Sequence, residues 1–193
     1  MVIDEILDHN ERFVQRNTLS SIGHAPRRRM AVVTCMDCRL VQMFEQALGL
    51  ERGDVLELRT AGATISKPER ADGANDLIRS LAGGIYLLGV REVAVIGHTQ
   101  CGLAHANPTA LTASMQALGV DPQALIEKEK LGNVQGLMNW LGAFDDVAMG
   151  VRIAEFFQLV QPFLSFRLIV VHAAIDEQEP SAGPQHAGRL TDK

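Results

Sequence analysis

Three residues of the kinds that bind soft metal ions follow two apolar runs of the sequence. Cys35 comes directly after residues 30–34, and His98 and Cys101 come shortly after residues 93–97. Two thiolates and one imidazole form a donor set that suits zinc. Three protein ligands leave a fourth position open, as a catalytic site requires. We therefore predict that Cys35, His98 and Cys101 bind one Zn²⁺ ion.

A carboxylate and a guanidinium stand just beyond the first of these cysteines, at Asp37 and Arg39. A charge-assisted pair of hydrogen bonds from Arg39 would keep Asp37 ionised and fixed in orientation. Asp37 could then accept a hydrogen bond from zinc-bound hydroxide, or coordinate the zinc itself in a closed form of the site. We predict that Asp37 and Arg39 are the catalytic residues.

Cys38 introduces a first alternative, because it could serve as the fourth ligand of a closed zinc site with three cysteines and one histidine. Such a site would be structural rather than catalytic. It would leave Asp37 and Arg39 without a role, so we favour the open site.

A second alternative is a thioredoxin-like redox pair, because Cys35 and Cys38 have the Cys-x-x-Cys spacing after an apolar run. This alternative leaves His98 and Cys101 unexplained, and no Trp precedes Cys35. The sequence alone assigns no role to two further histidines, His105 and His172.

The elements expected around these residues alternate between short apolar strands and amphipathic helices. Strands are expected at residues 30–34, 55–59, 93–97 and 166–174, and helices at residues 2–20, 40–48, 72–88 and 151–164. Residues 103–150 are expected to be mostly helical, with breaks at Pro108, Gly119, Pro122, Gly132 and Gly136. This alternation predicts an α/β fold, with a central, mainly parallel sheet of four to five strands flanked by helices.

Strand order determines where a binding crevice forms in such a sheet. If strands 55–59 and 93–97 lie on opposite sides of strand 30–34, the crevice falls at the carboxyl ends of strands 30–34 and 93–97. Cys35 and His98 follow those two ends. The topology would thus bring ligands together that are distant in the sequence.

Small residues beside the expected crevice could bring the backbone close to a ligand. We predict that the substrate cleft includes the following four: Thr60, Ala61, Gly62 and Gly102.

The length of 193 residues fits a single domain over residues 1–193. Within it, residues 1–29 are expected to form an N-terminal helical arm and loop, and residues 176–193 a mobile tail. The net charge of -5 argues against a general nucleic-acid-binding protein.

The sequence also favours a cytoplasmic protein without a membrane anchor. No apolar run reaches the roughly 20 residues that cross a bilayer. Acidic residues interrupt the apolar segment at the N-terminus, which is unlike a signal peptide. The three cysteines, an odd number, fit a reducing compartment in which thiols bind metals or do chemistry.

Together these motifs resemble the beta class of carbonic anhydrases. The family signature is Cys-x-Asp-x-Arg followed by His-x-x-Cys-Gly, and here it is carried by Cys35, Asp37, Arg39 and residues 98–102. The resemblance extends from about residue 30 to residue 103, through Arg-Thr-Ala-Gly at residues 59–62 and the helix segment 76–81. It implies a zinc-dependent lyase that interconverts carbon dioxide and bicarbonate. It also implies a homodimer, or a multiple of one, with clefts near the subunit interface.

The chain departs from the family pattern at several positions. Thr60 stands where Asn is common, and Gln100 where Asp is frequent. Val32 replaces the Trp of members regulated by bicarbonate, and residues 171–178 lack the familiar Tyr-Asp-x-x-Thr-Gly ending. Hydrolases of carbonyl sulfide and carbon disulfide share the same core motifs, so hydrolysis of these gases is the alternative activity.

Overall fold

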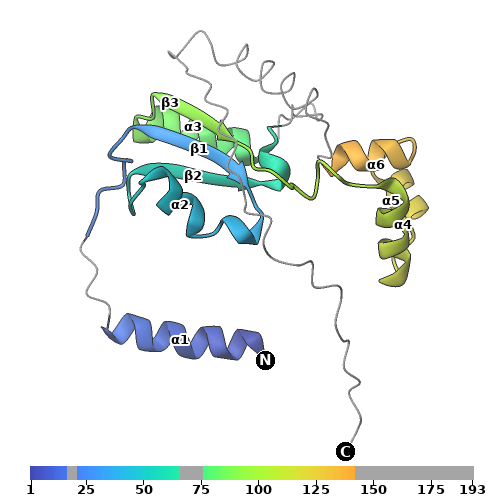
Figure 1. The fold of residues 1–193 in the computed structure, drawn as a ribbon, viewed down its shortest axis with the longest axis horizontal. Helices are drawn as coiled ribbons and strands as arrows, with labels where there is room; N and C mark the ends of the chain where they lie inside the picture. Colours follow the sequence, from blue (N-terminus) through green and yellow to red (C-terminus); the bar gives the residue numbers. More distant parts are fainter. Residues whose placement is uncertain (17–20, 66–75, 142–193) are drawn as a thin grey trace, which may run out of the picture.

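The chain is described here from a computed structural model that covers residues 1–16, 21–65 and 76–141. In this part of the chain, β1 (Met30–Cys35), β2 (Val55–Thr60) and β3 (Glu92–Ile96) form a parallel sheet in the order β2-β1-β3 (Figure 1). The two outer strands therefore lie on opposite sides of β1. This is the order that puts a crevice at the carboxyl ends of β1 and β3.

Helices and short turns complete the described chain. They are α1 (Val2–Arg16), η1 (Cys38–Leu40), α2 (Met43–Leu48), η2 (Ala61–Ala63), α3 (Asp76–Leu88), α4 (Pro108–Ala117), α5 (Pro122–Lys128) and α6 (Val134–Trp140). The predicted α/β fold with a parallel sheet and flanking helices is confirmed. The predicted fourth strand at residues 166–174, the helix at 151–164, His172 and the tail at 176–193 lie outside the described residues.

The core has two halves, one on each face of the sheet. Successive side chains of a strand point to opposite faces. Ala31 and Val33 of β1 belong to a buried cluster that includes Leu81 of α3. Val32 belongs to a second cluster, with Phe44 of α2. Apolar burial on both faces explains why β1 is an unbroken apolar run rather than an alternating one.

The single helix predicted at residues 40–48 is wrong at its start. The structure has the turn η1, then a break, then α2 from Met43. Gln42 causes the break, since its φ of 65° lies in the left-handed region, which an α-helix cannot include. The backbone directly after β1 is thus a compact turn, which keeps residues 37–39 beside the end of that strand.

Helices α4, α5 and α6 pack against one another beyond β3. Pro108 and Pro122 begin helices rather than interrupt them, because the first helical position needs no N–H donor. The predicted break at Gly136 is wrong, since this residue lies inside α6. Its backbone contacts Leu131 so closely that a Cβ atom there would overlap the Leu131 carbonyl.

The N-terminal helix α1 has no buried residue and lies apart from the sheet in Figure 1. Its apolar side chains face solvent, and at least half of the surface of Ile3, Ile6 and Leu7 is exposed. The prediction of a helix there is confirmed as far as Arg16. Across the described ranges we find no helix both long and apolar enough to span a membrane.

Candidate metal centre

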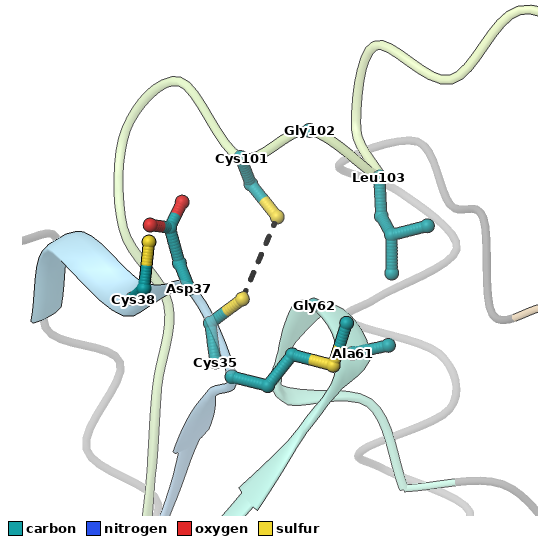
Figure 2. A pocket seen from close by; sticks show the side chains of 9 residues that line it. Cys35, Asp37, Cys38, Ala61, Gly62, Cys101, Gly102 and Leu103 are labelled. Atoms are coloured by element: carbon teal, nitrogen blue, oxygen red, sulfur yellow. Dashed lines mark hydrogen bonds between the residues drawn. The ribbon is translucent and has the colours of Figure 1, made fainter. Parts of the chain in front are cut away.

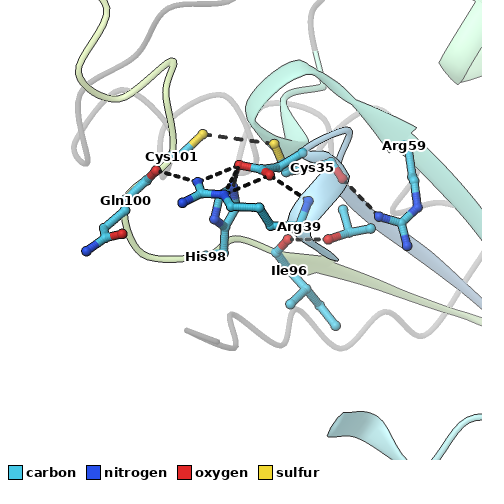
Figure 3. Close-up of polar contacts among 9 residues, drawn as sticks. Cys35, Arg39, Arg59, Ile96, His98, Gln100 and Cys101 are labelled. Atoms are coloured by element: carbon cyan, nitrogen blue, oxygen red, sulfur yellow. Dashed lines mark hydrogen bonds and ion pairs between the residues drawn. The ribbon is translucent and has the colours of Figure 1, made fainter. Parts of the chain in front are cut away.

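Cys35, His98 and Cys101 converge at the carboxyl edge of the sheet. Cys35 is the last residue of β1, and His98 follows β3 by one glycine. Their donor atoms and the Sγ of Cys101 all lie within 4.8 Å of one another, and the two Sγ atoms are 4.0 Å apart (Figure 3). Both cysteines are buried. The three predicted ligands are therefore brought together in a geometry that could hold a metal ion.

The histidine shows why a metal fits here. The His98 side chain is only 1% exposed, and neither ring nitrogen has a hydrogen-bond partner among the described residues. The nearest carboxylate oxygen, Asp37 Oδ2, is 3.8 Å from Nε2, which is too far for a hydrogen bond. A buried imidazole without a partner costs free energy. A metal bound through one of these nitrogens would remove part of that cost.

The segment from His98 to Cys101 is a turn rather than a helix. Gln100 has a φ of 55°, in the left-handed region. The backbone N–H of Ala104 donates to the Cys101 carbonyl at 3.1 Å, which continues the chain as turns until α4 begins at Pro108. A left-handed residue brings both predicted ligands of this segment to the same side without a helical turn.

Asp37 and Arg39 form the charge-assisted fork that their spacing predicts. Arg39 Nη2 donates to Asp37 Oδ2 at 2.6 Å, and Arg39 Nε donates to Oδ1 at 3.0 Å. The backbone N–H of Arg39 also donates to Oδ1, at 2.9 Å. Chiefly through the side-chain hydrogen bonds of Arg39, and against the effect of burial, the pKa of Asp37 is lowered to about 2. Asp37 is thus a carboxylate across the neutral pH range.

Burial acts in the opposite direction on one of the thiols. Removal from water raises the pKa of Cys101 above its ordinary value, and the neighbouring sulfur of Cys35 adds to this effect. The backbone N–H groups of Leu103 and Ala104 only partly oppose it. A metal ion that binds here must therefore displace a proton from a thiol that holds it firmly.

Cys38 is separate from the three-residue cluster. It lies in η1, its side chain is exposed, and its sulfur lies apart from the other two sulfurs in Figure 2. In the part of the chain that the structure describes, the donor atoms that group within 4.8 Å belong to Cys35, His98 and Cys101. This arrangement favours a site with three protein ligands over the closed alternative.

A pocket of about 420 Å³ opens beside the two buried sulfurs (Figure 2). It is lined by Cys35, Met36, Asp37, Cys38, Ala61, Gly62, Cys101, Gly102 and Leu103. Three of the four predicted cleft residues are among these. The fourth, Thr60, is not, and its hydroxyl donates to the Thr64 carbonyl at 3.0 Å.

Two apolar residues of this lining, Met36 and Leu103, are absent from the sequence prediction. Each directly follows a residue that the motif does identify, Cys35 and Gly102 respectively. Chain adjacency to the motif was the available signal. This signal does not tell whether either side chain faces the pocket, because the direction of a side chain in a turn depends on backbone angles that the sequence does not display.

Arg59 is a further residue near the site that the sequence analysis assigns no role. Its Nη1 donates to the Cys35 carbonyl at 3.3 Å, and its Nη2 lies 3.3 Å from Glu45 Oε1. Its guanidinium also stacks over the ring of Phe44, 5.7 Å from the centroid. Arg59 therefore connects the end of β1 to β2 and α2.

Comparison with known proteins places this arrangement in context. A family model described as carbonic anhydrase matches residues 30–138. The YvdA protein of Bacillus subtilis is 32% identical over 151 residues, which cover 77% of this chain and 73% of that protein. Beta-carbonic anhydrase isoform I from Trichomonas vaginalis has a similar structure, with a TM-score of 0.69 and 32% identity over 88% of this chain and 91% of that chain.

Similarity also extends to an enzyme with a different substrate. A protein named carbon disulfide hydrolase from Acidithiobacillus thiooxidans is 27% identical over 147 residues, which cover 71% of this chain and 63% of that protein. The family match includes the whole metal cluster and every residue that lines the pocket.

Proposed function

The chain belongs to the beta-carbonic anhydrase family, and we propose that it catalyses the reversible hydration of carbon dioxide to bicarbonate and a proton. We further propose that Cys35, His98 and Cys101 hold a Zn²⁺ ion for this reaction. The observation that supports the site most directly is the buried, unpartnered imidazole of His98 beside two buried thiols. Bound zinc would act as a Lewis acid that activates water as a nucleophile near neutral pH.

The role of Asp37 follows from its charge and its position. As an ionised carboxylate it can only accept hydrogen bonds, so it can orient a water molecule through that molecule's proton. Arg39 engages both Asp37 oxygens from one side and leaves further lone pairs of the carboxylate available. We propose that Asp37 orients the attacking water and that Arg39 holds Asp37 in place.

The pocket supports a small, weakly polar substrate. Met36, Ala61 and Leu103 contribute apolar side chains, while Gly62 and Gly102 leave the wall beside the sulfurs without side chains. A linear gas molecule has few polar atoms to satisfy, so an apolar wall lets it approach without loss of hydrogen bonds. In this proposal the pocket delivers the gas to the edge where Asp37 and the metal ligands meet.

We propose that the protein is a single domain over residues 1–193 and works as a homodimer or a multiple of one. The exposed apolar side chains of α1 support association, because the described residues do not cover them. We propose a cytoplasmic location, which the three free thiols support. Carbon dioxide and bicarbonate are the proposed small-molecule partners, and neither nucleic acid nor membrane has a role.

A sulfur gas is the second candidate substrate, supported by the relative named carbon disulfide hydrolase. Carbonyl sulfide and carbon disulfide are linear relatives of carbon dioxide, and the same attack by water would hydrolyse them. A non-catalytic zinc domain is less well supported, because the exposed Cys38 would have to become its fourth ligand.

Turnover of carbon dioxide, carbonyl sulfide and carbon disulfide, measured side by side on zinc-loaded protein, tests the proposal. We expect the highest rate on carbon dioxide, and loss of that rate when the zinc is removed and its return when zinc is restored. A higher rate on either sulfur gas would make that gas, rather than carbon dioxide, the substrate of the enzyme. No turnover of any of the three by folded, zinc-loaded protein would reject an enzymatic role.

A further inference from the structure

We propose that Gln100 is a positioning residue, which acts through its main-chain carbonyl to hold the guanidinium of Arg39 and, through it, the carboxylate of Asp37. Arg39 Nη2 donates to the Gln100 carbonyl at 3.1 Å (Figure 3). The same nitrogen donates to Asp37 Oδ2 at 2.6 Å. The catalytic part of this inference rests on the proposed function, whereas the geometric part does not.

The contact connects the two loops that carry the metal ligands. Asp37 and Arg39 belong to the segment after β1, and the last residue of β1 is Cys35. Gln100 belongs to the loop after β3, directly before the ligand Cys101. One guanidinium nitrogen thus hydrogen-bonds to both loops, and the position of the Asp37 carboxylate becomes tied to the loop that contains His98 and Cys101.

The contact depends on an uncommon backbone conformation at Gln100. Its φ of 55° lies in the left-handed region, which residues with a Cβ seldom adopt and which persists where surrounding contacts hold it. The direction of a carbonyl depends on the backbone angles of its own residue. A change of Gln100 to a negative φ would therefore turn its carbonyl away from Arg39.

Arg39 needs a second anchor because much of its side chain is in water. The side chain is 45% exposed, whereas that of Asp37 is 16% exposed. An exposed ion pair by itself restrains two side chains weakly, since water and salt compete for both partners. A hydrogen bond to a fixed main-chain oxygen removes much of this freedom from the guanidinium, and the fork then orients Asp37.

Substitutions at Gln100 can separate backbone conformation from side-chain chemistry. Gln100→Val should disfavour the left-handed conformation, because a β-branched residue adopts it with difficulty. Gln100→Asn is the matched control, since Asn tolerates this region, and Gln100→Gly is a second control without any Cβ. We expect Gln100→Val to lower kcat about tenfold at an unchanged zinc content, and both controls to retain kcat within about twofold.

A double-mutant cycle then distinguishes positioning from a general disturbance of the loop. If Gln100 acts through Arg39, the tenfold effect of Gln100→Val should shrink to less than about twofold when Arg39→Ala is already present. The same fold loss in both backgrounds, or a loss of zinc in parallel with kcat, would overturn the proposal. If Gln100→Val does not fold, Gln100→Thr takes its place in the cycle, because threonine is also β-branched and adopts a positive φ with difficulty, but is more polar than valine.

A readout independent of turnover keeps this inference separate from the proposed function. Rotation of the Arg39 guanidinium can be followed by NMR of its side-chain nitrogens in zinc-loaded protein. We expect slow rotation in the wild type and in Gln100→Asn, and faster rotation in Gln100→Val. Equal rotation in all three would reject the anchor even in an active enzyme. Lack of turnover on every gas, together with the expected NMR result, would reject the proposed function but leave the anchor established.

Discussion

The sulfur atoms of Cys35 and Cys101 lie 4.0 Å apart, although 66 positions separate them in the chain. Cys35 is the last residue of β1 and Cys101 lies on the loop after β3, and these strands are neighbours in the sheet. Sheet pairing that places Thr34 opposite Ile96 sets the two loops side by side. The proposed metal site is therefore a direct product of the pairing of two core strands.

Replacement of either buried sulfur should abolish zinc binding. We expect Cys35→Ser and Cys101→Ser to retain almost no zinc after loading and dialysis, because each removes one of three protein ligands. Cys38→Ser is the matched control and should retain about one zinc per chain, since Cys38 lies outside the cluster. Metal analysis by atomic absorption measures this. Loss of zinc from Cys38→Ser would instead support the closed, four-ligand site.

Asp37→Ala should separate metal binding from catalysis. We expect zinc to be retained and carbon dioxide turnover to fall about 100-fold, a typical loss when a group that handles the reacting proton or water is removed. The melting temperature should change little, because the Asp37–Arg39 pair is partly exposed. Stopped-flow hydration assays and thermal melts provide both measurements. Full turnover in a folded, zinc-loaded variant would contradict the role proposed for Asp37.

Zinc affinity should rise steeply with pH. Burial raises the pKa of Cys101, so its thiol holds a proton at neutral pH and zinc must displace that proton. Each thiol proton that zinc displaces makes the association constant increase about tenfold per pH unit below the pKa of that thiol, so Cys101 alone contributes a slope of about one. Competition with a chelator between about pH 6.5 and 8.5, corrected for the chelator's own titration, would measure this slope. An affinity that does not change over this range would contradict the prediction, and Cys38→Ser should show the wild-type slope.

Asp54 should contribute to stability at neutral pH but not in acid. It is buried, and its carboxylate accepts hydrogen bonds from the Glu51 backbone N–H at 3.1 Å and from Arg27 Nε at 2.9 Å. These contacts, with the Glu51 N–H first, lower the pKa of Asp54 in the folded state. Its stabilising contribution is thus complete above the unfolded pKa and is lost as pH falls through the folded pKa.

Asp54→Asn tests this assignment through the pH dependence of unfolding. We expect a lower melting temperature than wild type at pH 7, and a difference that narrows as the pH approaches the acid range. Glu51→Gln is a suitable control, because its exposed carboxylate lies 3.4 Å from Arg27 and should matter little. A constant difference between wild type and Asp54→Asn at every pH would show that the charge of Asp54 is unimportant.

Removal of α1 should weaken association between subunits. Deletion of residues 1–16 removes the exposed apolar face that contains Ile3, Ile6 and Leu7. We expect the truncated protein to dissociate at a higher concentration than the full chain in analytical ultracentrifugation, because less apolar surface is buried between subunits. An unchanged dissociation constant would show that α1 takes no part in assembly. A fully active monomer would count against the proposed dimer.

The sequence by itself determined the class of the fold and predicted the chemistry of the site. The sequence directly gives the donor types at Cys35, His98 and Cys101. It also gives the two-residue spacing of Asp37 and Arg39. Apolar runs that alternate with amphipathic segments led to the α/β fold, because strands and helices have different periods of burial. These properties are local, since each depends on residue type and on spacing within a short segment.

Only the tertiary structure decided how these pieces meet. Strand order brought the donor atoms of the proposed ligands within 4.8 Å of one another, and burial left the His98 ring nitrogens without a partner among the described residues. The left-handed angle of Gln100 and the contact of Arg59 with the Cys35 carbonyl have no marker in the sequence. A residue with a Cβ adopts a positive φ only where its surroundings hold it there, and a side chain reaches another strand only when the register brings it within reach. Both depend on contacts between distant parts of the chain, which residue type and local spacing do not specify.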